Sequence, residues 1–237
     1  MKFFRFNAGL AAILIAIAYA FAPLDRLTAP GRLAITALMV SEAAILVYWA
    51  TIGRMLARIR PFLVGTAVGG ALVAIVCQAI DASAGRSVGA QTLTIASFIS
   101  SAALLGGACT AMVLGHWYLV IPSLNVSHLQ SVVKLHMASM VARIAAVAAA
   151  VIFAIAVWQP GLGPNFQRYM TSIDGIFFWQ RVLFGLAGPA VLSYLTWETA
   201  KIRSTQSATG ILYVDFFTVV VGEVLAKYIL LATRVPV

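Results

Sequence analysis

The dominant feature of the sequence is a series of seven long apolar runs separated by short polar connections. A helix needs about 20 apolar residues to cross the roughly 30 Å hydrocarbon core of a bilayer, and each run reaches or approaches that length. Apolar and polar residues do not alternate within the runs as they do in membrane β-barrels. The pattern predicts an all-α, polytopic membrane helix bundle that forms a single domain over residues 1–237. The expected spans are residues 7–24, 33–52, 62–80, 93–121, 132–158, 176–197 and 211–233.

The first apolar run has two interpretations. Lys2 and Arg5 precede it, and the small residues Ala20 and Ala22 lie at its end, which is also the pattern of a signal peptide. We expect residues 1–24 to be a retained first helix or signal anchor. Cleavage after this run would leave six spans.

Composition narrows the class of protein further. Hydrophobic residues make up 62% of the chain and charged residues only 10%, against about 25% in an average soluble domain. This contrast excludes a water-soluble fold, a disordered chain and a nucleic-acid-binding domain. Cys77 and Cys109 both lie inside apolar runs, so a disulfide framework is not indicated.

The net charge of the chain is +9, and its basic residues are spread among the connections between the apolar runs. Their distribution predicts the orientation of the chain in the membrane. With the N-terminus inside, the inner segments contain Lys2, Arg5, Arg54, Arg58, Arg60, Lys134, Lys201 and Arg203. The outer segments contain Arg26, Arg32, Arg86, Arg168 and Arg234. Cytoplasmic loops are enriched in Lys and Arg, so we expect an inner (plasma) membrane protein with a cytoplasmic N-terminus.

Six ionisable residues lie within the expected spans, and a charge at the bilayer centre costs about 2.5–3.5 kcal/mol on insertion scales. They are Glu42, Arg143, Arg181, Asp215, Glu223 and Lys227. Three acids and three bases are suited to internal pairing. Their depths place Glu42, Arg143 and Glu223 in one mid-membrane cluster, and Glu223 and Lys227 are four residues apart on one helix. The alternatives are buried ion pairs that fix helix packing and a proton path or quinone-head site.

The histidines at the turn between the fourth and fifth spans are the sharpest candidates for a cofactor site. Pro122 is expected to end the fourth helix, and Ser127 and Gln130 have the spacing of a capping box at the start of the fifth. His116 and His136 then lie roughly 9–14 Å from the shared turn and face each other at equal depth.

Two opposed imidazoles can bind the iron of a haem b. Because soft side chains lie nearby, a site for copper or another metal is an alternative. Those side chains are Met112, Met140 and Cys109. Arg143, on the same face as His136, suits a haem propionate or a quinone oxygen. The structural alternative is a pair of interfacial histidines beside Trp117 and Tyr118.

Small residues predict close helix contacts. Gly65 and Gly69, and likewise Gly107, Ala111 and Gly115, have small-xxx-small spacing. Pro189 is expected to kink the sixth helix.

The last two spans carry a short pattern that points to a known family. The sequence FWQRVL at 178–183, followed by VGEVLAK at 221–227, resembles the C-terminal helices of the anchor subunits of DMSO reductase, which belong to the polysulfide-reductase-like (NrfD-type) membrane subunits. The matching positions are Arg181, Gly222, Glu223 and Lys227. The resemblance covers about a quarter of the chain, and the family has more helices. It implies a quinone site rather than a haem, and a partner subunit carrying iron–sulfur clusters or haem.

The expected function is the membrane subunit of a quinone-linked electron-transfer complex. Quinone or haem b would bind near His116, His136 and Arg143, while Asp215, Glu223, Glu42 and Arg143 would handle protons or charge. The same two histidines are the candidate metal ligands. Two alternatives stay open: a proton-coupled small-molecule transporter, and a structural or assembly subunit without a cofactor.

Overall fold

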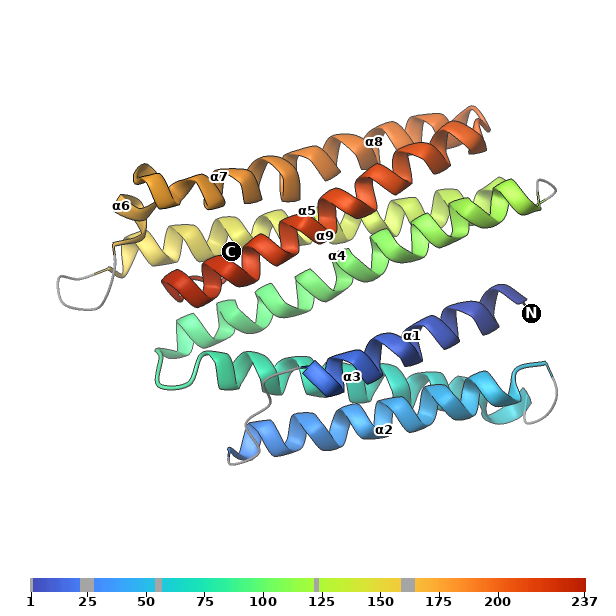
Figure 1. Cartoon of the computed structure of the whole chain (residues 1–237), viewed down its shortest axis with the longest axis horizontal. Coiled ribbons are helices and arrows are strands. Elements are labelled where there is room, and N and C mark those ends of the chain that lie inside the picture. The colour runs from blue at the N-terminus through green and yellow to red at the C-terminus, as the bar shows by residue number, and fades with distance from the viewer. Residues whose placement is uncertain (1, 22–27, 54–56, 122–123, 159–164) are drawn as a thin grey trace. The chain divides into compact units, whose positions relative to one another are not determined.

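The computed structural model describes residues 2–21, 28–53, 57–121, 124–158 and 165–237. Helices dominate these ranges, and no strand occurs in them (Figure 1). The α-helices are α1 (Lys2–Phe21), α2 (Ala29–Thr51), α3 (Arg60–Ala82), α4 (Val88–Val120), α5 (Val126–Ala156), α6 (Phe166–Thr171), α7 (Ile176–Val182), α8 (Gly188–Lys201) and α9 (Thr205–Thr233). Three short helical turns are η1 (Ala57–Ile59), η2 (Ile173–Gly175) and η3 (Leu183–Ala187).

Seven helical segments in the described ranges are long and apolar enough to cross a membrane, which confirms the predicted fold class. Six of them contain α1, α2, α3, α4, α5 and α9, and the seventh, Ile173–Lys201, runs through η2, α7, η3 and α8. Helices are favoured because hydrocarbon offers backbone groups no hydrogen-bond partners outside their own segment. The chain therefore has the architecture of a multi-pass membrane protein.

Two helices begin about two turns earlier than their apolar runs. α5 begins at Val126 rather than near 132, and α9 begins at Thr205 rather than near 211. The α5 start is capped by Asn125, whose side chain accepts a hydrogen bond from the Ser127 amide at 3.0 Å. The expected Ser127–Gln130 capping box is wrong, because Gln130 Nε2 donates to the Ala200 carbonyl instead. Pro122 lies outside the described residues.

The chain divides into two compact units, residues 1–91 and 92–237. In unit 1 (residues 1–91), α2 and α3 pack closely: Ser41 Oγ donates to the Ala67 carbonyl at 2.7 Å, and a Cβ at Gly70 would lie 2.8 Å from the Ala37 oxygen. A Cβ at Gly65 or Gly69 would meet no atom within 4 Å. The close contact on α3 is therefore at Gly70 rather than at the predicted pair.

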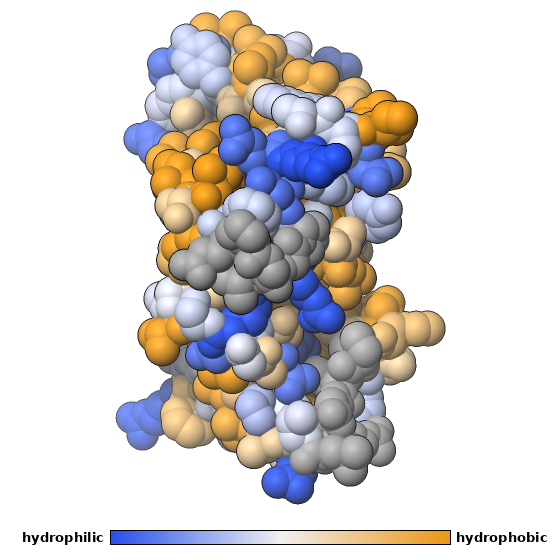
Figure 2. All heavy atoms as spheres, turned by 90° about the vertical axis from the view of Figure 1, so that its left-hand side faces the viewer, coloured by the Kyte–Doolittle hydropathy of each residue, from blue (hydrophilic) through white to orange (hydrophobic). Residues whose placement is uncertain are grey.

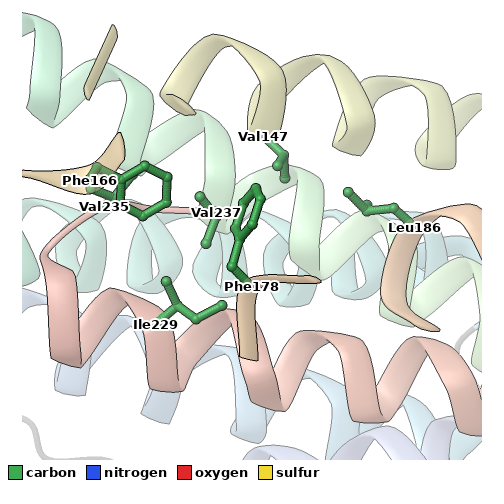
Figure 3. Packing of buried hydrophobic residues seen from close by; sticks show 7 residues of the cluster. All are labelled: Val147, Phe166, Phe178, Leu186, Ile229, Val235 and Val237. Atoms are coloured by element: carbon green, nitrogen blue, oxygen red, sulfur yellow. The ribbon is translucent and has the colours of Figure 1, made fainter. Parts of the chain in front are cut away.

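Unit 2 (residues 92–237) contains most of α4, together with α5 to α9. One apolar cluster joins α5, α6, α7, η3, α9 and the segment after α9 (Figure 3). Its members are Val147, Phe166, Phe178, Leu186, Ile229, Val235 and Val237. Packing of these side chains fixes α7 and α9 against α5 near one end of the unit.

A π-helical turn, η3, interrupts the sixth span directly before Gly188 and Pro189. Proline removes a backbone donor and crowds the preceding turn, which is why a break was expected at this point. Gly185 lies within this π-helical turn and faces Gly222 of α9.

The connections between spans are more polar than the spans. Figure 2 faces the left-hand end of Figure 1, where α6 lies, and shows hydrophilic residues gathered among apolar ones. Many large apolar side chains are exposed along the helices, among them Leu135 on α5 and Leu231 on α9. This distribution is expected of helix sides that face lipid and helix ends that face water.

Candidate functional site

The buried ionisable groups of unit 2 lie at two levels along α5 and α9. His136 and Arg143 are seven residues apart on α5, and Asp215 and Glu223 are eight apart on α9, which is about 10–12 Å of helix in each case. His136 contacts Asp215 and Arg143 contacts Glu223, so α5 and α9 run in the same direction. We call these contacts the histidine level and the glutamate level.

The histidine level consists of two fully buried side chains. His136 Nε2 lies 2.7 Å from Asp215 Oδ2, and both side chains are 0% exposed. The two atoms are within ion-pair distance, but their contact lacks the alignment of a hydrogen bond. The absence of alignment means that the pair is incompletely satisfied.

Two further atoms at the histidine level lack any polar partner in the described part of the chain, namely His136 Nδ1 and Asp215 Oδ1. Gly107 of α4 covers the imidazole: a Cβ there would lie 3.2 Å from Nδ1. The close helix contact predicted from the small residues of α4 is therefore present at Gly107, where the missing side chain leaves room for His136.

The glutamate level is a dense network around one carboxylate. Arg143 binds Glu223 through two hydrogen bonds, Nε to Oε1 and Nη2 to Oε2, each 2.9 Å long. Arg181 Nη2 donates to Oε1 at 2.8 Å, and Ser101 Oγ donates to Oε2 at 2.5 Å. The predicted association of Arg143 with Glu223 is confirmed. The network joins α4, α5, α7 and α9.

Arg143 uses all five of its N–H donors within unit 2. Besides its bonds to Glu223, Nη1 donates to Ser97 Oγ at 2.8 Å and to the Ser97 carbonyl at 3.3 Å, and Nη2 donates to the Val237 carbonyl at 3.1 Å. Glu42, predicted to join this cluster, lies on α2 in unit 1. Arg143 needs no further acceptor to satisfy its guanidinium group.

Arg181 is fully buried but only partly satisfied. Its Nε and Nη1 have no hydrogen-bond partner among the described residues. Nη1 lies where Gly185 of η3 and Gly222 of α9 approach each other, and a Cβ at either glycine would collide with the backbone of the other. The two glycines therefore let α9 approach close enough for Arg181 to reach Glu223.

Lys227 does not form the predicted pair with Glu223. Its ammonium lies 3.7 Å from the centroid of the Phe98 ring, a cation–π contact, and no ion pair joins it to Glu223 in the described ranges. The reason is that Glu223 turns toward α5 and α7, where two guanidinium groups hold both of its oxygens.

The structure does not bring the two candidate haem ligands together. His116 is exposed, and its Nδ1 lies 2.8 Å from the hydroxyl of Tyr213. His136 instead packs against Gly107, nine residues or about 13 Å away from His116 along α4. The equal-depth prediction is wrong because α4 ends four residues after His116, whereas α5 begins ten residues before His136.

The soft side chains proposed for a metal site are also dispersed. Met140 is buried in an apolar cluster with Leu104, Ala108 and Val219, while Cys109 is only half-buried. Within the described ranges, no group of three or more His, Cys, Asp or Glu side chains is placed to hold a metal ion.

Sequence reasoning missed the neutral partners of the network, Ser97 and Ser101. They are four residues apart on α4, and this spacing was the available signal for one polar face. Comparison with known proteins gives no match: no family model, no curated protein and no solved structure is significantly similar to this chain.

Proposed function

We propose that the chain is the membrane subunit of a quinone-linked electron-transfer complex, in which the His136–Asp215 pair exchanges protons with the quinone. The orphaned atoms of that buried pair, His136 Nδ1 and Asp215 Oδ1, carry the proposal. Buried polar atoms without partners are rare in folded proteins and need an explanation such as a catalytic role. Ionisable residues inside a membrane commonly belong to proton relays.

The chemistry of a quinone fits these side chains. Its reduction to quinol takes up two electrons and two protons, and the electrons would come from a partner subunit carrying iron–sulfur clusters or haem. Histidine exchanges protons most readily near neutral pH. Asp215 would hold the imidazole in place and stabilise its protonated form. His136 would then be the proton carrier, and a carrier has to lie within hydrogen-bond reach of the quinone oxygen.

Haem b suits this arrangement less well. Axial ligation by His116 and His136 requires both imidazoles to face one iron, and they instead contact Tyr213 and Asp215. We therefore propose quinone rather than haem b as the ligand. We also propose that the protein lies in the inner (plasma) membrane with its N-terminus in the cytoplasm.

A structural or assembly role is the second candidate, and the glutamate level favours it. All five donors of Arg143 are engaged, and both Glu223 oxygens accept hydrogen bonds from neighbouring helices. Such a network fixes helix packing and leaves Arg143 no donor for a ligand.

Binding of a short-chain quinone by the purified protein in detergent tests the proposal. Wild type is expected to bind decylubiquinone or menadione, with quenching of tryptophan fluorescence as the readout. His136→Gln should weaken binding about 10- to 100-fold, because hydrogen bonds to charged groups contribute about 1.5–3 kcal/mol. His128→Gln, which changes an exposed histidine, is the matched control and should bind as wild type does.

Equal quinone binding by the wild type and the His136 variant would overturn the proposal. So would a wild-type protein that binds neither quinone, an outcome that favours the structural role. Proton-linked uptake of a solute by the purified protein in liposomes would favour a transporter instead.

A further inference from the structure

Two turns of unit 2 enclose a pocket far from the buried levels. The first turn joins α4 to α5, and the second joins α8 to α9. Between them lies a pocket of about 490 Å³. Its walls are residues 124–127 and Gln130 from the first turn, and Arg203 and Thr205 from the second. Because both turns connect spans, the pocket opens where helices end, at the level of lipid headgroups.

Hydrogen bonds hold both walls of this pocket in place. The Tyr118 hydroxyl of α4 donates to the Asn125 carbonyl at 2.5 Å, which fixes the first turn. The Ala200 carbonyl accepts from Gln130 Nε2 and from the Arg203 amide, each at 3.2 Å, and so links the two turns. The pocket is therefore a built feature of the fold.

The charge around the pocket is positive. Arg203 is the charged residue of its lining, and its guanidinium has no hydrogen bond or ion pair with the described residues. The ammonium of Lys134 lies 4.9 Å from the Trp197 ring centroid. Lys201 lies 5.3 Å from the same ring and is paired with Glu198 at 2.6 Å. This leaves Arg203 and Lys134 as the unpaired charges among these described residues.

Arg203 occupies a backbone position that glycine would fill more easily. Its φ is 59°, in the left-handed region, directly after the end of α8. Glycine is the usual residue at such a helix end because it lacks the Cβ that is strained there. The chain therefore has an arginine at a strained backbone position, and its side chain lines the pocket.

We propose that this pocket binds the phosphate headgroup of an anionic phospholipid. A phosphate oxygen accepts hydrogen bonds from the Arg203 guanidinium, and Lys134, four residues along α5 from the lining residue Gln130, adds a second positive charge. Leu135 of α5 and Leu195 of α8 are exposed apolar side chains on two of the helices that the turns connect, and acyl chains would cover such side chains. Basic pockets between transmembrane helices are a known way of binding acidic lipid headgroups. The proposal is independent of quinone binding at the histidine level.

Native mass spectrometry of the full chain with added lipid tests the proposal. Wild type should retain phosphatidylglycerol about fivefold better than phosphatidylcholine, since one basic residue near a membrane surface contributes about that factor. Millimolar inorganic phosphate should not displace the lipid. Arg203→Gly should abolish the preference while raising the thermal unfolding midpoint measured in phosphatidylcholine.

Arg234→Gly provides a matched control. Arg234 also has a positive φ, 63°, at the end of α9, and it does not line the pocket. This variant should keep the preference for phosphatidylglycerol. Arg203→Gln, which removes the charge and keeps a side chain, should lose the preference as Arg203→Gly does.

Three results would overturn the proposal: no lipid preference in the wild type, an Arg203→Gln variant that keeps it, or displacement of the lipid by inorganic phosphate. The last result would identify a site for free phosphate.

Discussion

The two buried levels of unit 2 use similar residue types in opposite ways. At the glutamate level one carboxylate accepts hydrogen bonds from Arg143, Arg181 and Ser101. At the histidine level, the carboxylate of Asp215 has one ion-pair contact, with His136, and its other oxygen has no hydrogen-bond partner in the described part of the chain. At the glutamate level every donor of Arg143 and both oxygens of Glu223 are engaged, and only Arg181 keeps donors without a partner in the described residues. Such a network fixes a structure, whereas an acid and a base that are both incompletely bonded retain the capacity to bind or exchange a proton.

The largest loss of stability is expected from a substitution at the glutamate level. Glu223→Gln leaves two buried guanidinium groups without a counter-charge, and breaking a buried ion pair from one side costs about 3–5 kcal/mol. We expect a loss of that size in the free energy of unfolding, measured by denaturant titration in detergent.

Glu198→Gln is the control for the Glu223 substitution. Glu198 pairs with Lys201 at 2.6 Å, but both side chains are more than 40% exposed. Exposed pairs contribute about 0.2–1 kcal/mol, so this variant should unfold nearly as the wild type does. If the two substitutions have the same effect, the glutamate level does not hold the helices together.

A smaller effect is expected where η3 and α9 cross. Gly222→Ala places a methyl group against the Gly185 backbone, which cannot move aside as a flexible side chain could. Overpacking of this kind costs about 1–3 kcal/mol. Gly210→Ala on the same helix meets no atom within 4 Å and should stabilise α9, because alanine is the better helix former. Thermal unfolding of the two variants side by side measures the difference, and equal midpoints would contradict the close approach.

The sequence was sufficient to predict the spans and most members of the site, but not their pairing. Arg143, Arg181, Asp215 and Glu223 stand out because charges are rare in hydrocarbon. Which of these residues pair depends on their depth in the membrane. The sequence indicates this depth relative to the ends of the apolar runs, and α5 and α9 begin before those ends. Asp215 and His136 are each ten residues from the start of their helix, which places them at one level.

The neutral parts of the site were harder to find from sequence. Serine is common in transmembrane helices, so the four-residue spacing of Ser97 and Ser101 is a weak signal until Arg143 and Glu223 are placed beside them. Rotation matters as well. Gly115 faces Thr209 and Leu212 of α9, and one further residue turns His116 by about 100°, to an exposed position.

The most direct test of the central claim is an infrared difference spectrum, recorded as menadione bound to the purified protein is reduced at an electrode. If the histidine level exchanges protons with the quinone, wild type should show a change in a carboxyl band, and Asp215→Asn should abolish it. A carboxyl signal that is unchanged in Asp215→Asn would contradict the account.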